Sequence, residues 1–210
     1  MSNCDDDIGI KVACWNKGGA LQPLKDKVNE IENLIKTNNF GVFGVTEANF
    51  FREDDIKDVE ISGYSFFWDK GRENAIRKNS RCCLYVRNDL NCKIREDLMK
   101  DTTPEIWMEI GEPRKRRSLL CVYYREFSEW NQRMWTNSIK CQTERLEEWL
   151  ETVEEQLEKE LWLIGDFNFD LNRKDDNSYS RKSLSQLAFQ ELIGRGMTQM
   201  IEMYTLFLSL

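Results

Sequence analysis

The segment Leu161–Asn168 reads LWLIGDFN and joins a short apolar run to an acidic and an amide side chain. An apolar run that ends at glycine and polar residues indicates a buried β-strand, and this one delivers Asp166 at its end. A strand that is buried on both faces fixes its terminal side chain firmly, which suits a functional group. The alternative is that Asp166 and Asn168 simply cap the loop that follows.

Two segments nearer the N-terminus share this design. Val12–Asn16 (VACWN) ends in an amide, and Val42–Glu47 (VFGVTE) ends in a carboxylate. Taken alone, Asn16 is a typical turn residue, and Glu47 could be the first residue of a helix. Together with Asp166, however, the three ends supply hard oxygen ligands without nitrogen or sulfur, a set that favours magnesium or manganese over zinc or copper. We therefore expect them to belong to one site.

The rest of the chain alternates strand and helix patterns. Apolar runs predict strands at residues 10–15, 41–46, 64–68, 81–86, 105–110, 119–124 and 161–165. Between the first two strands, four residues recur at helical spacing and predict an amphipathic helix within a βαβ-type unit: Leu24, Val28, Ile31 and Ile35.

Two more helices are predicted in the second half of the chain, over residues 131–160 and 184–193. The first carries an apolar stripe made of Leu146, Leu150, Val153 and Leu157. Glutamates flank this stripe, and such density indicates a solvated face on a helix that covers a sheet.

Composition limits the class of protein. The chain has 210 residues, 40% of them hydrophobic, and a formal net charge of −7. A chain of this size buries roughly 70% of its unfolded surface, which is enough for one domain with its own core. Because the sequence contains no histidine, it excludes a Ser-His-Asp or Cys-His triad, a histidine metal cluster and a histidine base.

The sequence also indicates the cellular compartment of the protein. No apolar run reaches the roughly 18 residues that a membrane span needs, and three aspartates stand near the N-terminus, where a signal peptide carries positive charge. The seven cysteines show no C-x-x-C spacing, which favours reduced core thiols over disulfides or zinc. We expect a monomer that is nuclear or cytoplasmic, neither secreted nor membrane-spanning.

The order of four motifs resembles the endonuclease/exonuclease/phosphatase superfamily. Within it, the chain is most similar to the apurinic/apyrimidinic-type endonuclease domain of non-LTR (LINE-type) retrotransposons. The motifs, in chain order, are Cys14-Trp-Asn-x-x-Gly19, Val45-Thr-Glu47, Leu120-Cys-Val-Tyr123 and Gly165-Asp-Phe-Asn168. Gly-Asp-Phe-Asn after an apolar strand is the most specific of them, and the resemblance covers about residues 10–205.

The resemblance implies an α+β fold, a four-layer αββα sandwich of the DNase I-like type, and a Mg²⁺- or Mn²⁺-dependent endonuclease that acts on DNA. A reverse transcriptase fused to the parent element is also implied. The implied roles are metal binding by Glu47 and Asn16, contact with the scissile phosphate by Tyr123, activation of water by Asp166, and binding of a phosphoryl oxygen by Asn168.

Two later motifs of the family, an aspartate strand and a Ser-Asp-His signature, have no counterpart here. We therefore expect an incomplete, truncated domain over residues 10–205 that lacks the last strands of one sheet, preceded by a flexible N-terminus (1–9) and followed by an aberrant tail (206–210). Loss of one charge-stabilising donor typically costs about 100–1,000-fold in rate, so we expect impaired catalysis. An uncovered sheet edge would also favour aggregation.

Candidate DNA contacts lie in a basic stretch that follows three aromatic residues: Lys70, Arg72, Arg77, Lys78 and Arg81. An ordinary solvated loop explains this stretch equally well, and residues 114–117 (RKRR) are best explained as a hairpin tip.

Two other functions stay open. One is an inositol-phosphate phosphatase-like or sphingomyelinase-like enzyme of the same fold. The other is a catalytically inactive fragment that binds DNA or a protein partner.

Overall fold

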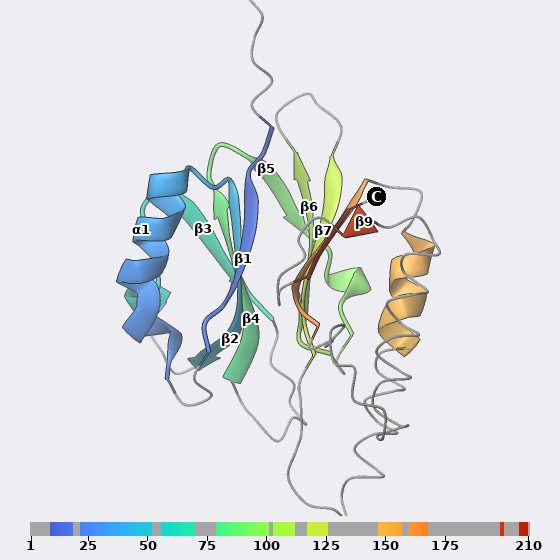
Figure 1. Ribbon diagram of the computed structural model, residues 1–210, viewed down its shortest axis with the longest axis horizontal. Helices are drawn as coiled ribbons and strands as arrows, with labels where there is room; N and C mark the ends of the chain where they lie inside the picture. The colour runs from blue at the N-terminus through green and yellow to red at the C-terminus, as the bar shows by residue number, and fades with distance from the viewer. Residues whose placement is uncertain are drawn as a thin grey trace, which may run out of the picture.

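The computed structural model describes residues 9–18, 22–51, 56–69, 79–100, 103–111, 117–125, 147–156, 160–167, 198–199 and 206–209. Two mixed β-sheets lie face to face, and a helix covers the outer face of each (Figure 1). This is the four-layer αββα sandwich that the sequence predicts. No helix in the described part of the chain is long and apolar enough to cross a membrane.

The first sheet has the strand order β1-β2-β4-β3. Its strands are β1 (Val12–Asn16), β2 (Val42–Phe51), β4 (Asn79–Arg87) and β3 (Tyr64–Trp68). β1 and β2 are parallel and are connected by the 3-10 turn η1 (Leu24–Lys27) and the helix α1 (Val28–Asn38), which confirms the βαβ unit. The other pairs are antiparallel.

The second sheet has the order β5-β6-β7-β8-β10-β9. Its strands are β5 (Asn91–Ile94), β6 (Glu105–Gly111), β7 (Ser118–Tyr124), β8 (Leu161–Asp166), β10 (Leu206–Ser209) and β9 (Thr198–Gln199). Only β7 and β8 pair in parallel among the pairings recorded for this sheet. Two further 3-10 turns, η2 (Ile56–Asp58) and η3 (Glu96–Leu98), precede β3 and β6.

The end of the sequence differs from expectation. Leu206–Ser209, which we assigned to an aberrant tail, forms β10 and pairs antiparallel with β8. Three of its four residues are Leu or Phe, which suits a strand next to the apolar β8. Residues 1–8 lie outside the described residues, and the domain boundaries stay a prediction.

Alternate residues of each strand supply the cores on its two faces, as a period of two requires. In β4, Cys83 and Tyr85 pack with Ile31 and Ile35 of α1. The intervening residues of β4 face the second sheet and join the core between the sheets: Cys82, Leu84 and Val86.

A third core lies under the helix formed by residues 147–155. Trp149 and Val153 of this helix pack on the outer face of the second sheet, and Leu150 is only partly buried there. Val153 of the predicted apolar stripe is therefore buried, as expected. The buried face of the helix also includes Trp149, its largest apolar side chain, which was not part of the predicted stripe. Leu146, Leu157 and the predicted helix at 184–193 lie outside the described residues.

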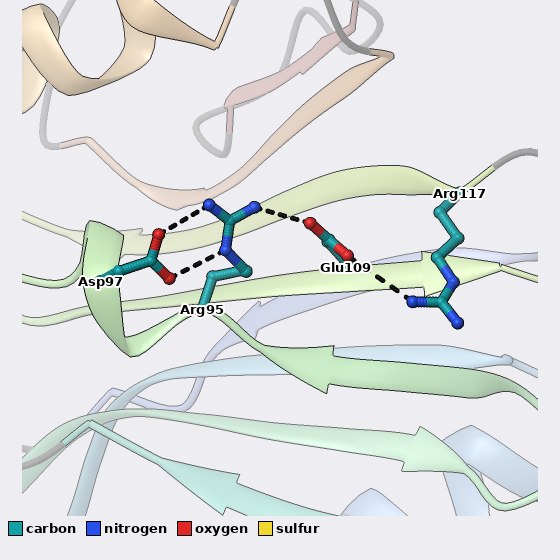
Figure 2. Close-up of polar contacts among 4 residues, drawn as sticks. All are labelled: Arg95, Asp97, Glu109 and Arg117. Carbon is teal, nitrogen blue, oxygen red and sulfur yellow. Dashed lines mark hydrogen bonds and ion pairs between the residues drawn. The ribbon is translucent and has the colours of Figure 1, made fainter.

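An ion-pair network joins the loop after β5 to η3, β6 and the start of β7 (Figure 2). Arg95 donates to both carboxylate oxygens of Asp97, at 2.8 and 2.6 Å, and to Glu109 at 2.6 Å. Arg117 lies 3.7 Å from the other oxygen of Glu109. The bidentate bond from Arg95 lowers the pKa of Asp97 to about 2.

This network predicts a pH-dependent contribution to stability. Because the pKa of Asp97 is lower in the folded state, its pair with Arg95 stabilises the fold above the ordinary carboxyl range and loses that effect as pH falls toward about 2. Asp97 is largely exposed, so Asp97→Asn should lower the melting temperature at pH 7 by at most about 3 °C. Melting curves from pH 7 to pH 2 should show this difference shrinking below about pH 4. Asp58→Asn, at an exposed aspartate of η2, controls for net charge, and a difference that grows on acidification would contradict the account.

Candidate functional site

Three strand-borne polar side chains meet at one end of the sandwich. The amide nitrogen of Asn16 donates to Oδ2 of Asp166 at 2.5 Å and to Oε1 of Glu47 at 3.4 Å. Asn16 ends β1 in the first sheet and Asp166 ends β8 in the second, and these two strands are in contact. The cluster therefore bridges the two sheets and joins residues 150 positions apart in the sequence.

The orientation of the Asn16 amide follows from the turn that Asn16 starts. Its Oδ1 accepts the backbone N–H of Gly18 at 2.8 Å. The amide NH₂ therefore faces the two carboxylates, and Asn16 acts as a shared donor that holds them together. The sequence left open whether Asn16 is a turn residue or part of a functional site, and in the structure it is both. In this orientation its Oδ1 is bonded to Gly18 and its NH₂ group to the carboxylates, and the role of Asn16 as a metal ligand stays a prediction.

Glu47 sits in an unusual backbone conformation. β2 continues past it to Phe51, and the pairing with β4 shifts between Thr46 and Phe50 as a β-bulge. Glu47 and Asn49 have φ angles of 52° and 50° within this bulge. Residues other than glycine in this region cost of order 1–3 kcal/mol and cluster at functional sites, and bulges re-aim side chains beside such sites. The bulge therefore sets the direction of the Glu47 side chain.

The tyrosine in this cluster is Tyr124 and not Tyr123. The Tyr124 hydroxyl donates to Oε1 of Glu47 at 3.2 Å. Tyr123 points to the opposite face of β7, where its ring stacks on Trp149 with centroids 4.4 Å apart. Adjacent strand residues face opposite sides, so an assignment one residue off reverses the face. The structure does not bring Tyr123 to the cluster.

Arg81 is part of the cluster, although the sequence suggests a DNA contact for it. Its side chain enters from β4 and is buried, with 4% of the residue exposed. Nη2 donates to the Tyr124 hydroxyl at 3.1 Å, Nη1 donates to Oδ1 of Asn49, and the guanidinium carbon lies 4.9 Å from the centroid of the Tyr124 ring. Burial raises the pKa of Tyr124 to about 12, and the charge of Arg81 opposes that rise.

Lys17 is a second buried cation that sequence reasoning missed. Its Nζ donates to the carbonyl oxygens of Gln22 at 2.6 Å and Gly18 at 3.2 Å. Burial lowers its pKa, and the charge of Glu47 acts in the opposite direction. No pattern in the sequence distinguishes Lys17 from a surface lysine; its only signal is that it follows Asn16.

Gly165 controls the approach of β8 to β7 immediately before Asp166. Its φ is 141°, and a Cβ at this position would lie 1.9 Å from the carbonyl oxygen of Tyr123. Only glycine fits this close backbone contact. The glycine of the Gly-Asp-Phe-Asn motif therefore determines where Asp166 lies.

The donor set fits a hard divalent cation. Glu47 and Asp166 supply carboxylate oxygens from two sheets, and Mg²⁺ is commonly held by one or two carboxylates with water completing its shell. The described residues contain no group of three or more His, Cys, Asp or Glu that could hold a metal ion. Asn168, the implied ligand of a phosphoryl oxygen, and four of the candidate DNA contacts lie outside those residues: Lys70, Arg72, Arg77 and Lys78.

Solved structures share this fold, although no protein-family model and no curated protein matches the sequence. The endonuclease domain of TRAS1, a telomere-specific non-LTR retrotransposon, is 15% identical with a TM-score of 0.58, over 95% of this chain and 83% of that chain. The AP endonuclease LMAP from Leishmania major is 14% identical with a TM-score of 0.68, over 95% of this chain and 78% of that one. An AP endonuclease from Archaeoglobus fulgidus is 10% identical with a TM-score of 0.63, over 96% and 86%. This chain therefore shares the fold of these endonucleases.

Proposed function

We propose that this chain is a divalent-cation-dependent phosphodiesterase that nicks DNA, similar to the endonucleases of non-LTR retrotransposons. The convergence of Asn16, Glu47 and Asp166 from three strands of two sheets carries the proposal. DNA as substrate is supported by the names of the similar structures, two of which are AP endonucleases and one a retrotransposon endonuclease domain.

The chemistry follows from the charge of a phosphodiester, which repels an attacking hydroxide. Glu47 and Asp166 would hold a Mg²⁺ or Mn²⁺ ion, whose positive charge would screen this repulsion and stabilise the leaving alkoxide. Asp166 takes the proton of the attacking water. Asn16 keeps the two carboxylates at a fixed separation through its shared amide, which cuts the cost of ordering them during the reaction.

The remaining roles divide between described and undescribed residues. Tyr124 takes the part that the resemblance gave to Tyr123, because its hydroxyl is the one in the cluster. Asn168 stays proposed as the donor to a phosphoryl oxygen, and the basic stretch from Lys70 to Lys78 as a DNA contact. A fused reverse transcriptase, a monomeric state and a nuclear or cytoplasmic location stay predictions as well.

The sequence of 210 residues offers no imidazole to the scissile phosphate. We propose that the missing imidazole lowers the rate of DNA nicking by roughly 100–1,000-fold, compared with a related endonuclease that has the Ser-Asp-His motif.

Nicking of supercoiled plasmid tests the proposed function. We expect slow conversion to open circles in Mg²⁺ and none in EDTA, at a rate about 100–1,000-fold below that of an endonuclease that has the Ser-Asp-His motif under the same conditions. A panel of abasic duplex, phosphoinositide and sphingomyelin extends the assay. Hydrolysis of either lipid without DNA nicking would favour the other enzymes of this fold, and no hydrolysis of any substrate would favour a binding fragment.

A further inference from the structure

The guanidinium of Arg81 connects the two parts of the structure that hold Glu47. Through Nη1 it contacts Asn49 in the bulge of β2, and through Nη2 it contacts Tyr124 at the end of β7. Asn79 also donates to Oδ1 of Asn49, at 2.7 Å. Arg81 is held in turn by Asp69, whose carboxylate accepts the backbone N–H of Arg81 at 3.0 Å.

The donors in this chain of contacts have a fixed direction. A guanidinium can only donate hydrogen bonds, whereas a phenol donates one and also accepts. Because Arg81 donates to the Tyr124 oxygen, the single Tyr124 proton is directed to its other partner, Oε1 of Glu47. The positive charge next to the phenol also strengthens it as a donor.

The two oxygens of Glu47 therefore differ. Oε1 accepts from Tyr124 at 3.2 Å and from Asn16 at 3.4 Å. Within the part of the chain that the structure describes, no hydrogen bond is recorded to Oε2. Oε1 is thus committed to the protein, and Oε2 is the atom that a cation can use.

We propose that Arg81 is a positioning residue, which acts through Tyr124 and Asn49 to hold Glu47 with Oε1 bonded to the protein and Oε2 available to a divalent cation. This inference rests on the proposed function of the site. It replaces the DNA contact that the sequence suggested for Arg81, because a side chain this deeply buried is committed to Tyr124 and Asn49.

A double-mutant cycle tests the inference without relying on catalysis. The variants are Arg81→Met, Tyr124→Phe and both together, and the readout is Mn²⁺ affinity, measured from the electron paramagnetic resonance signal of unbound Mn²⁺. Groups that orient a metal ligand typically contribute 10–100-fold to affinity or activity. We expect each single variant to weaken Mn²⁺ binding by about 10-fold, and the double variant to be no weaker than the worse single one. Arg87→Met, at an arginine of the same strand that pairs with Asp89, should leave the affinity within about 2-fold.

Nicking kinetics with Mg²⁺ add a second readout. A positioning role lowers kcat and leaves the KM for DNA nearly unchanged, whereas a DNA contact raises KM. Arg81→Lys keeps the charge but loses the planar fork, so it should restore little of the Mn²⁺ affinity.

The outcomes separate this inference from the proposed function. Non-additive loss of Mn²⁺ affinity in a chain that cleaves no DNA would support the role of Arg81 and contradict the nuclease. Fully additive losses, an unchanged affinity in Arg81→Met, or a wild-type chain that binds no Mn²⁺ would overturn the inference. If Arg81→Met does not fold, Tyr124→Phe alone must still weaken Mn²⁺ binding by about 10-fold, and an unchanged affinity overturns the inference.

Discussion

Replacing Glu47 by glutamine is expected to lower the rate of Mg²⁺-dependent DNA nicking by roughly 100–1,000-fold. Glutamine keeps the shape of the side chain and an oxygen that can accept from Asn16 and Tyr124. It removes the negative charge that a divalent cation requires. Since the packing of the bulge is unchanged, the urea midpoint of unfolding should move little, and the loss should appear in single-turnover nicking rates.

The matched control for this variant is Glu32→Gln. Glu32 is a partly buried glutamate of α1 that pairs with Lys36, away from the strand ends. It makes the same chemical change without touching the cluster, so the nicking rate should stay at the wild-type value. Equal rates for Glu47→Gln and wild type would show that any cleavage observed arises elsewhere.

Replacing Gly165 by alanine is expected to destabilise the fold by about 3 kcal/mol or more. The new Cβ would lie 1.9 Å from the carbonyl oxygen of Tyr123, so β8 must move away from β7. That movement displaces Asp166, the next residue, and nicking should fall with stability. Urea unfolding followed by circular dichroism gives the change in the free energy of unfolding.

Gly63→Ala isolates the contribution of backbone strain. Gly63 also has a positive φ, of 88°, but a Cβ there meets nothing within 4 Å. Its substitution should therefore cost only about 1 kcal/mol, from the disfavoured conformation alone. If Gly165→Ala costs no more than Gly63→Ala, the close contact with Tyr123 does not limit this position.

The polar residues at the strand ends could be predicted from the sequence, because an apolar run that ends in Asn, Glu or Asp indicates a buried strand with a firmly held polar side chain at its end. The sequence thus predicted Asn16, Glu47 and Asp166 as one group, and the strand at 64–68 agrees with β3 at both ends. The choice between Tyr123 and Tyr124 could not be made in this way. Both faces of β7 are covered by apolar cores, so LLCVYY has no polar-apolar alternation to indicate which face each residue takes.

Buried cations and bulges were the other features that the sequence did not disclose. The buried side chain of Arg81 contacts Tyr124, 43 positions away in the sequence. The buried Lys17 donates instead to the carbonyl oxygens of its near neighbours Gly18 and Gln22. Charged residues are otherwise mostly exposed, so composition points to the surface. The bulge in β2 had one weak signal, because asparagine, here Asn49, tolerates positive φ better than most residues.

Anomalous diffraction from crystals of the chain soaked in MnCl₂ shows directly whether Glu47 holds a divalent cation. We expect an anomalous peak within about 2.2 Å of an oxygen of Glu47, close to Asp166 and absent from crystals of Glu47→Gln. A crystal that diffracts well but shows no Mn²⁺ at Glu47, or that places the carboxylates of residues 47 and 166 far apart, would contradict this expectation.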